Sequence, residues 1–132
     1  MIFVDANVLL DIVTGDASWA EWSLTQLSQA RSLGSLATNG IVYAEVSVGM
    51  DDIAQVDALF AAAELETVPV PNAALFLAGK AFARYRRAGG TRTSVLPDFF
   101  IGAQASVLGV PLLTRDARRY RTYFPQLQVI TP

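Results

Sequence analysis

The chain alternates short apolar segments of strand character with longer segments whose apolar residues recur at helical spacing. The expected strands are residues 2–4, 36–38, 67–70, 111–114 and 128–130. Helices are expected at 7–13, 18–33, 72–88 and 97–108, after Asn39-Gly40, after Asp51-Asp52 and from about Ala117. Such alternation indicates a mostly parallel sheet flanked by helices. We therefore expect a single domain over residues 1–132, a three-layer α/β/α fold of the α/β class with a short, mostly parallel sheet.

The start of the second helix carries a sequence signal of its own. Ser18-Trp19-Ala20-Glu21 has the pattern of a capping box, in which a serine binds the helix N-terminus and a glutamate three positions later binds back. The pattern predicts Ser18 as the N-cap residue.

Two residue types that often carry hydrolytic chemistry are missing from the chain, which contains no cysteine and no histidine. Their absence excludes disulfides, thiolate metal sites, Ser-His-Asp and Cys-His catalysis, and the usual zinc sites. A hydrolase built on this sequence must therefore use carboxylates, together with hard metal ions.

The sequence offers no segment that would direct it into a membrane. No apolar run approaches the roughly 18 residues of a bilayer span, and the amino terminus enters a strand without a basic leader region. We expect a soluble, cytoplasmic protein with no membrane partner.

Four acidic residues are distinguished by the elements around them. Asp5 directly follows the first strand, and Asp116 follows the fourth. Ligands of open α/β sheets bind beyond the carboxyl ends of the strands. Asp98 begins a helix, where free N–H groups favour a carboxylate. Glu45 lies in a helix of mostly apolar residues, so its side chain faces either solvent or a site.

Each acid also has a purely structural interpretation. Asp98 is explained equally well as a helix N-cap, and Asp116 as the cap of the last short helix. Glu45 is explained as a surface residue and Asp5 as a turn residue.

If the four acids converge, their charges need compensation. Two carboxylates about 5 Å apart repel by about 3 kcal/mol at an effective dielectric constant of about 20, so several together are unfavourable without protons or cations. Ligands that are all oxygen favour Mg²⁺ or Mn²⁺ over zinc. Such an ion lowers the pKa of bound water and stabilises charge on a phosphoryl group.

The charges are divided unevenly along the chain. Residues 1–79 hold ten of the twelve acidic residues and one basic residue, for a net charge of −9. Residues 80–132 hold the other nine basic residues and only two acids, Asp98 and Asp116, for a net charge of +7. A basic half around two isolated acids is typical of a phosphate-binding surface beside a metal site, and equally of a solvated helix face.

Four segments carry a resemblance to a known family. In chain order they are VDANVLLDI, IVYAEVS, LPDFFIGAQA and LLTRD. They resemble the signature segments of the PIN-domain ribonucleases, in particular the VapC-type toxins of type II toxin–antitoxin pairs. The resemblance extends over almost the whole chain.

The resemblance implies a metal-dependent endoribonuclease toxin that cleaves cellular RNA, either tRNA or rRNA, with Mg²⁺ or Mn²⁺ as cofactor. Its catalytic and metal-binding acids correspond to Asp5, Glu45, Asp98 and Asp116, and its supporting polar residues correspond to Asn7 and Thr114. It also implies a cognate antitoxin, whose carboxy-terminal segment lies over the active-site groove, and a homodimer.

The basic half then has a candidate task. Arginine binds phosphate through planar, bidentate donors, so we expect several arginines to bind the RNA backbone. The candidates are Arg84, Arg86, Arg87, Arg92 and Arg115. The arginines that follow Asp116, namely Arg118, Arg119 and Arg121, are explained equally well as a solvated helix surface.

The sequence departs from the family pattern at two positions. Ala6 takes the place of a hydroxyl residue between Asp5 and Asn7, and Gln104 stands where a histidine is frequent. Neither change removes a carboxylate, and both concern the positioning of the substrate.

Two other functions are compatible with the sequence. An α/β phosphatase or phosphoacceptor domain also places an aspartate after its first strand, but it normally uses an Asp-x-Asp pair or an acidic cluster with a nearby lysine. Here position 7 is Asn and the single lysine, Lys80, is in mid-helix. The other alternative is a catalytically silent binding module that acts only in an antitoxin complex.

Overall fold

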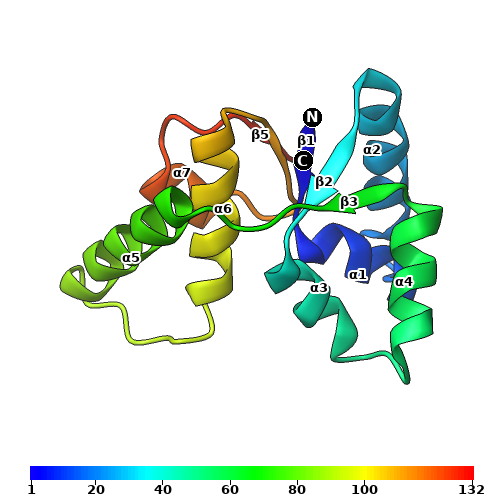
Figure 1. Cartoon of the computed structure of the whole chain (residues 1–132), viewed down its shortest axis with the longest axis horizontal. Coiled ribbons are helices and arrows are strands. Elements are labelled where there is room, and N and C mark those ends of the chain that lie inside the picture. The colour runs from blue at the N-terminus through cyan, green and yellow to red at the C-terminus, as the bar shows by residue number, and fades with distance from the viewer.

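Five short strands form one parallel sheet in the computed structural model, which describes residues 1–132 (Figure 1). They are β1 (Ile2–Val4), β2 (Leu36–Thr38), β3 (Leu65–Thr67), β4 (Leu112–Leu113) and β5 (Val129–Ile130). Their order across the sheet is β3-β2-β1-β4-β5, and every neighbouring pair is parallel. The prediction of an α/β domain with a short, mostly parallel sheet is confirmed.

Seven helices connect the strands and cover the two faces of the sheet. They are α1 (Ala6–Thr14), α2 (Ala20–Leu33), α3 (Gly40–Ser47), α4 (Ile53–Ala62), α5 (Asn72–Arg87), α6 (Leu96–Leu108) and α7 (Arg118–Tyr123). Figure 1 shows α5, α6 and α7 on one side of the strands and α1, α2 and α4 on the other, which is the predicted three-layer arrangement. None of these helices has the length and apolar character needed to cross a membrane.

The direction in which successive strands are added to the sheet changes at β1. The chain runs outward from β1 to β2 and β3, then returns across the sheet to β4 on the opposite side of β1. Because parallel crossovers are right-handed, the connections before and after this return lie on opposite faces. The carboxyl ends of β1 and β4 therefore adjoin at the point where the connections diverge, which is where open α/β sheets bind ligands.

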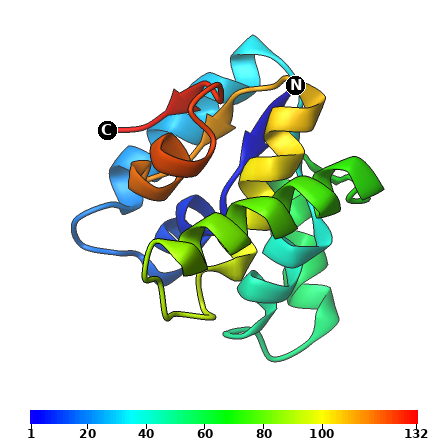
Figure 2. The ribbon, with the colours of Figure 1, turned by 90° about the vertical axis from the view of Figure 1, so that its left-hand side faces the viewer.

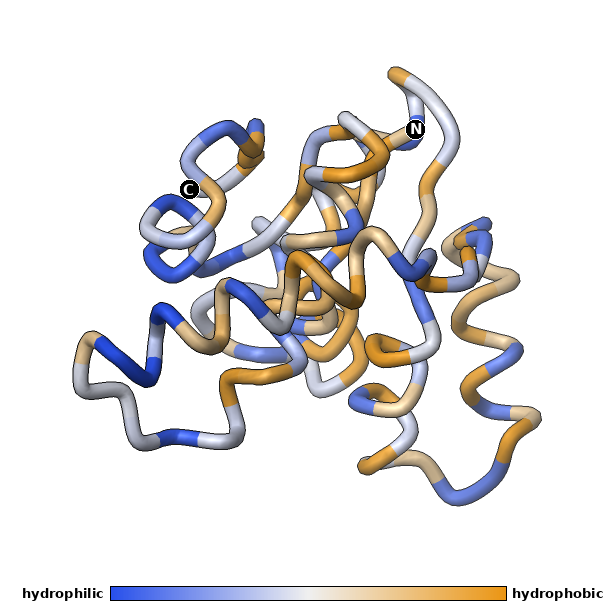
Figure 3. Tube along the Cα trace, turned by 60° about the vertical axis from the view of Figure 1, so that its left-hand side comes forward, coloured by the Kyte–Doolittle hydropathy of each residue, from blue (hydrophilic) through white to orange (hydrophobic).

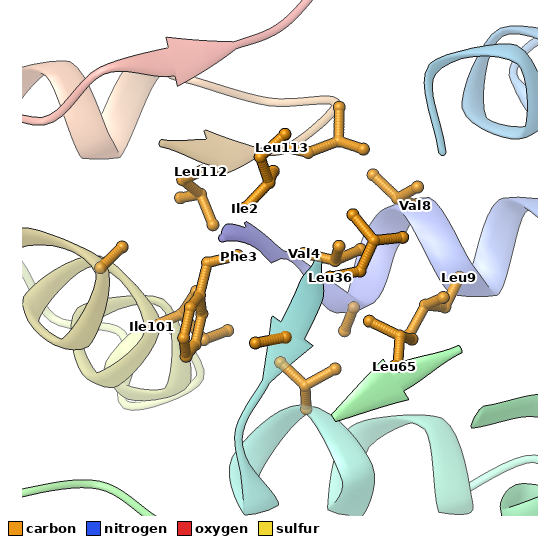
Figure 4. Packing of buried hydrophobic residues seen from close by; sticks show 14 of the residues in the cluster. Ile2, Phe3, Val4, Val8, Leu9, Leu36, Leu65, Ile101, Leu112 and Leu113 are labelled. Atoms are coloured by element: carbon orange, nitrogen blue, oxygen red, sulfur yellow. The ribbon is translucent and has the colours of Figure 1, made fainter. Parts of the chain in front are cut away.

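The core is built around β1, which is apolar on both faces. Phe3 and Val4 are fully buried, and Figure 4 shows Ile101 of α6 and Val8 of α1 on opposite sides of this strand. A strand covered by helices on both faces needs a continuous apolar run rather than an alternating one. The strand therefore passes directly from a dry core to the carboxylate of Asp5.

The start of α2 differs from the prediction. The helix begins at Ala20, and Trp19 at the N-cap position makes no side-chain cap. Asp16 instead accepts hydrogen bonds from the backbone N–H groups of Ser18 (2.9 Å) and Trp19 (2.8 Å). The predicted capping box is wrong because a carboxylate two residues earlier takes up these donors.

Strand β3 also lies earlier than the predicted 67–70, and only Thr67 belongs to both ranges. Glu64 adopts a left-handed conformation (φ 52°) that ends the preceding turn, so the chain enters the sheet at once with the buried Leu65. The other predicted elements agree with the structure to within one residue at either end.

Close packing between α6 and α7 depends on Gly102. A Cβ atom at this position would lie 2.6 Å from the ring of Phe124 and 3.0 Å from the ring of Tyr120. Both rings are buried, so neither can move aside into solvent. The missing side chain at Gly102 thus lets α7 lie against α6 and brings Tyr120 toward the ends of β1 and β4.

We predict that Gly102→Ala destabilises the fold by about 1–3 kcal/mol, the usual result of overpacking a close contact. Gly79 provides a matched control, because it lies inside α5 with no atom within 4 Å of an added Cβ. Gly79→Ala should stabilise the protein by about 0.5–1 kcal/mol, since alanine is the better helix former. Urea unfolding measures both changes, and effects of the same sign would contradict the packing role of Gly102.

Candidate active site

The site lies where β1 and β4 end side by side. Val4 pairs with Leu113 in the sheet, and the backbone N–H of Asp5 donates to the carbonyl oxygen of Leu113 at 2.9 Å. The parallel pairing thus places the side chains of Asp5 and Thr114 next to each other. The sequence-based expectation that the first and fourth strands end at one edge is met.

Asp5 is buried, with only 4% of its surface exposed, and both of its carboxylate oxygens accept hydrogen bonds. The backbone N–H of Ala6 donates to Oδ1 at 2.7 Å, while the hydroxyl groups of Thr114 and Tyr120 each donate to Oδ2 at 2.8 Å. Burial raises the pKa of Asp5 above its ordinary value, and these hydrogen bonds oppose the rise. Asp5 is therefore held firmly in an environment that disfavours its charge.

Asn7 and Thr114 link the start of α1 to the end of β4. The side-chain amide of Asn7 donates to Thr114 Oγ1 at 3.1 Å and to Asp5 Oδ2 at 3.4 Å, and its Oδ1 accepts from the backbone N–H of Arg115 at 3.1 Å. Both predicted supporting residues thus adjoin Asp5. Because Ala6 contributes its backbone N–H to Asp5, the hydroxyl absent at that position is not needed for this contact.

Asp98 and Asp116 line a pocket of about 460 Å³ together with Asp5 and Asn7. Asp98 accepts from Arg119 at 2.6 Å, and Asp116 accepts from Arg118 at 3.3 Å. Burial, then the charge of Asp5, raises the pKa of Asp98 to about 6. The hydrogen bond from Arg118 lowers the pKa of Asp116, which is half exposed.

Asp98 is not the N-cap of α6. Val95 takes the N-cap position, Leu96 begins the helix, and Asp98 lies within the first turn with its backbone N–H donating to the carbonyl oxygen of Val95. The purely structural interpretation of Asp98 as an N-cap is therefore wrong. Its side chain is free to point into the pocket.

Glu45 lies on α3 and does not line this pocket. Its Oε1 atom is buried without a hydrogen-bond partner. Burial raises the pKa of Glu45 to about 7, and the charges of Asp5 and Asp98 contribute to the increase. Glu45 is therefore partly shielded from solvent and interacts electrostatically with Asp5 and Asp98.

The four acids have the donor chemistry of a site for a hard divalent cation. They offer only oxygen atoms, and a cation would relieve both the repulsion that raises the pKa of Glu45 and the unpaired state of its Oε1. In the arrangement shown, no three acidic side chains form a group that could hold an ion. Two of them are engaged by arginines of α7 instead. The residues therefore fit such an ion in the kind of ligand that they supply.

Arg115 points away from the pocket. Its guanidinium makes a bidentate contact with the buried carboxylate of Asp11 (2.8 and 3.0 Å) and lies over the ring of Trp19, 5.6 Å from the ring centre. Ser23 donates to the same carboxylate at 2.9 Å. Arg115 thus ties the loop after β4 to α1 and α2, and its role in RNA binding stays a prediction.

The other candidate arginines lie at the end of α5 and in the loop that follows it. Figure 2 looks onto α5, α6 and α7, with this loop projecting below them, and Figure 3 shows hydrophilic positions gathered along the last turns of α5 and in α7. Arg84 donates to the carbonyl oxygen of Tyr123 at 2.9 Å, and Arg86 lies over Phe82. Arg87 and Arg92 are exposed.

The sequence did not identify Tyr120 as a residue of the site, and it left two explanations open for Arg119. Both line the pocket and contact acids that lie 115 and 21 residues away along the chain. Tyr120 is buried, and its pKa lies well above the ordinary value, so its hydroxyl stays neutral and donates to Asp5. The only available signal was the position of both residues just after Asp116 in RDARRY.

Comparison with known families identifies one match. The family model described as PIN domain matches residues 2–125. No curated protein matches the chain.

Several solved structures share the fold over nearly the whole chain. VapBC2 from Rickettsia felis, bound to a DNA fragment from its promoter, is 17% identical with a TM-score of 0.73, and the match covers 99% of this chain and 98% of that chain. VapBC-1 from nontypeable Haemophilus influenzae is 18% identical with a TM-score of 0.73 and the same coverage. FitAcB from Neisseria gonorrhoeae is 18% identical with a TM-score of 0.68, covering 98% of this chain and 96% of that chain. At these identities the likeness shows the fold.

We predict that Glu45→Gln stabilises the metal-free protein at pH 8 and has little effect at pH 5. The pKa of Glu45 is raised from 4.5 to about 7, so the folded state binds more protons than the unfolded state between these values. Stability in EDTA therefore falls as the pH rises through this window. Because Glu45 is only partly buried, the gain at pH 8 should be on the order of 1 kcal/mol.

Urea unfolding in EDTA at both pH values measures the effect. Glu66→Gln, an exposed change on β3, serves as the matched control. A gain of the same size at pH 5 would show that the charge of Glu45 is not its source.

Proposed function

The chain belongs to the PIN domain family, and from this premise we propose that it is a metal-dependent endoribonuclease that acts as the toxin of a toxin–antitoxin pair. PIN domains are generally nucleases. The observation that carries the proposal is the gathering of Asp5, Asp98 and Asp116 with their basic neighbours around one pocket at the reversal point of the sheet.

We assign the metal-binding role to Asp5, Glu45, Asp98 and Asp116. When bound, Mg²⁺ or Mn²⁺ would activate a water molecule and stabilise the charge that develops on the phosphodiester. Asp5 is oriented for this task by Thr114 and Tyr120, which fix its Oδ2, and by Ala6, which fixes its Oδ1. Asn7 holds the hydroxyl of Thr114 in place at 3.1 Å.

RNA is the proposed substrate, either tRNA or rRNA. The pocket opens among the basic residues of the second half of the chain, whose net charge is +7. We assign the binding of backbone phosphates to the arginines at the end of α5 and in the following loop, namely Arg84, Arg86, Arg87 and Arg92. Such contacts strengthen binding to RNA of any sequence, so the choice of target rests on other features.

A cognate antitoxin and a second copy of the chain are the proposed protein partners, and the cytoplasm is the proposed place of action. Support for these partners comes from the fold alone. The VapBC structures that share this fold are complexes, and one of them is bound to promoter DNA. We assign the carboxy-terminal segment of the antitoxin to the pocket, where it would cover the acids.

The phosphoacceptor alternative receives less support from the geometry. Such a domain normally uses an Asp-x-Asp pair or a nearby lysine, whereas Asn7 takes the place of the second aspartate and donates to Asp5 at 3.4 Å. The single lysine, Lys80, lies over the ring of Phe76 on α5 and does not line the pocket.

We predict metal-dependent cleavage of total cellular RNA at discrete positions, with Mg²⁺ or Mn²⁺ required and EDTA inhibitory. Asp98→Asn should lower the cleavage rate by roughly 10²-fold or more, as the loss of one stabilising group commonly does. Asp51→Asn, at an exposed turn before α4, is the matched control and should cleave normally. Equal cleavage by wild type and Asp98→Asn would mark the activity as contamination and favour the silent binding module.

We further predict that Arg86→Ala/Arg87→Ala weakens RNA binding and flattens its dependence on salt. Losing two phosphate contacts should reduce the slope of log K against log salt by about 1.4 for single-stranded RNA. Binding of a labelled oligonucleotide in EDTA at several salt concentrations measures the slope. Arg31→Ala, the basic residue of the acidic half, should leave it unchanged, and an unaltered slope in the double variant would remove these arginines from the interface.

A further inference from the structure

Helix α7 directs three consecutive side chains at three different acids of the site. Arg118 contacts Asp116, and Tyr120 donates to Asp5 at 2.8 Å. Between them, Arg119 donates to Asp98 at 2.6 Å. Glu45 is the one acid of the four that α7 does not contact, and it is also the one with an unpaired buried oxygen.

The two ion pairs differ in their surroundings. The side chain of Arg118 is 92% exposed, so its contact with Asp116 is that of a weak surface pair. The side chains of Arg119 and Asp98 are only 31% and 28% exposed, and one short hydrogen bond joins them. Asp98 therefore relies on Arg119 as its principal counter-charge.

A divalent ion held by Asp98 competes with Arg119 for the same carboxylate. Such an ion binds carboxylate oxygens directly at about 2.0–2.1 Å and carries two positive charges, so it repels a guanidinium left in place. Arg119 contacts one oxygen of Asp98, and no three acidic side chains in the structure form a group that could hold an ion. A divalent ion at Asp98 therefore weakens the Arg119–Asp98 pair.

We propose that Arg119 is an exchangeable counter-ion, which pairs with Asp98 before metal binding and with a phosphate of the RNA afterwards. The inference rests on the proposed function. Once the ion takes over Asp98, Arg119 is a partly buried cation without a partner, in the pocket where the phosphodiester has to bind. A guanidinium binds phosphate in the same bidentate manner as it binds a carboxylate.

The exchange requires only a side chain to turn, because α7 itself is anchored. Tyr120 and Phe124 are buried against Gly102 of α6, and the carbonyl oxygen of Tyr123 accepts a hydrogen bond from Arg84 at 2.9 Å. These contacts hold the helix beside the pocket with or without the Arg119–Asp98 pair. Metal occupancy is thereby coupled to phosphate binding through one residue.

The test compares Arg119→Gln with the wild type in two binding assays. Direct Mn²⁺ titration by electron paramagnetic resonance should show Arg119→Gln binding Mn²⁺ on the order of fivefold more tightly, because the competing cation is gone. Binding of a labelled single-stranded RNA in Ca²⁺, with its integrity checked on a gel, should be weaker by on the order of tenfold. In EDTA the two proteins should bind this RNA equally.

Arg121→Gln is the control for charge, since it removes an exposed arginine of the same helix. It should leave Mn²⁺ affinity unchanged, and any loss of RNA affinity should be the same in Ca²⁺ and in EDTA. Arg119→Lys, which keeps the charge without the bidentate geometry, should recover part of the RNA binding in Ca²⁺.

Opposite changes in metal and RNA affinity support the proposal. Unchanged or weaker Mn²⁺ binding by Arg119→Gln overturns it, as does a loss of RNA affinity that is equal in Ca²⁺ and EDTA. Asp98→Asn separates this failure from that of the proposed function. If the wild type binds no Mn²⁺, or if Asp98→Asn binds Mn²⁺ as tightly as the wild type, the proposed metal site is wrong. If Asp98→Asn weakens Mn²⁺ binding but Arg119→Gln changes neither affinity, only the proposed exchange of Arg119 is wrong.

Discussion

The burial of carboxylates at the end of a core strand is the constraint on which the rest of this structure depends. Strand β1 is apolar on both faces and is followed at once by Asp5, whose surface is only 4% exposed. Two more acids line the same pocket, and a fourth, Glu45, interacts electrostatically with Asp5 and Asp98. Their repulsion in a region of low dielectric would oppose folding unless each charge is compensated.

The compensation takes a different form for each acid. Asp5 receives hydrogen bonds from hydroxyl groups and a backbone N–H, whereas Asp98 and Asp116 receive arginines. Glu45 receives none of these, and its pKa of about 7 lets it gain a proton instead. The metal-free site is thus balanced by hydrogen bonds, arginines and a proton.

The sequence predicted the sheet, the layers and the position of Asp5 and Asp116 at one edge of the sheet, because these follow from local patterns. A continuous apolar strand that runs into an acid can be recognised without knowledge of its neighbours, and parallel strands end at one edge. The partners of the acids were harder to predict. Arg119 contacts Asp98, and Tyr120 contacts Asp5, only because α7 packs on α6 at Gly102. The sequence pattern around a buried tyrosine is the same whether its hydroxyl donates to a carboxylate or its ring only packs in the core.

Gln104 shows how a change from the family pattern is accommodated. Its Oε1 accepts from the buried amide of Asn39 at 2.9 Å, and its amide donates to the carbonyl oxygens of Val68 and Pro69. Asn39 in turn caps α3 through the backbone N–H groups of residues 41 and 42. Since α3 carries Glu45 and α6 carries both Gln104 and Asp98, this amide pair sets the distance between two acids of the site. An amide keeps the same charge and hydrogen-bonding pattern across the pH range in which the neighbouring acids titrate, so the spacing of α3 and α6 stays fixed while the charge of the site changes.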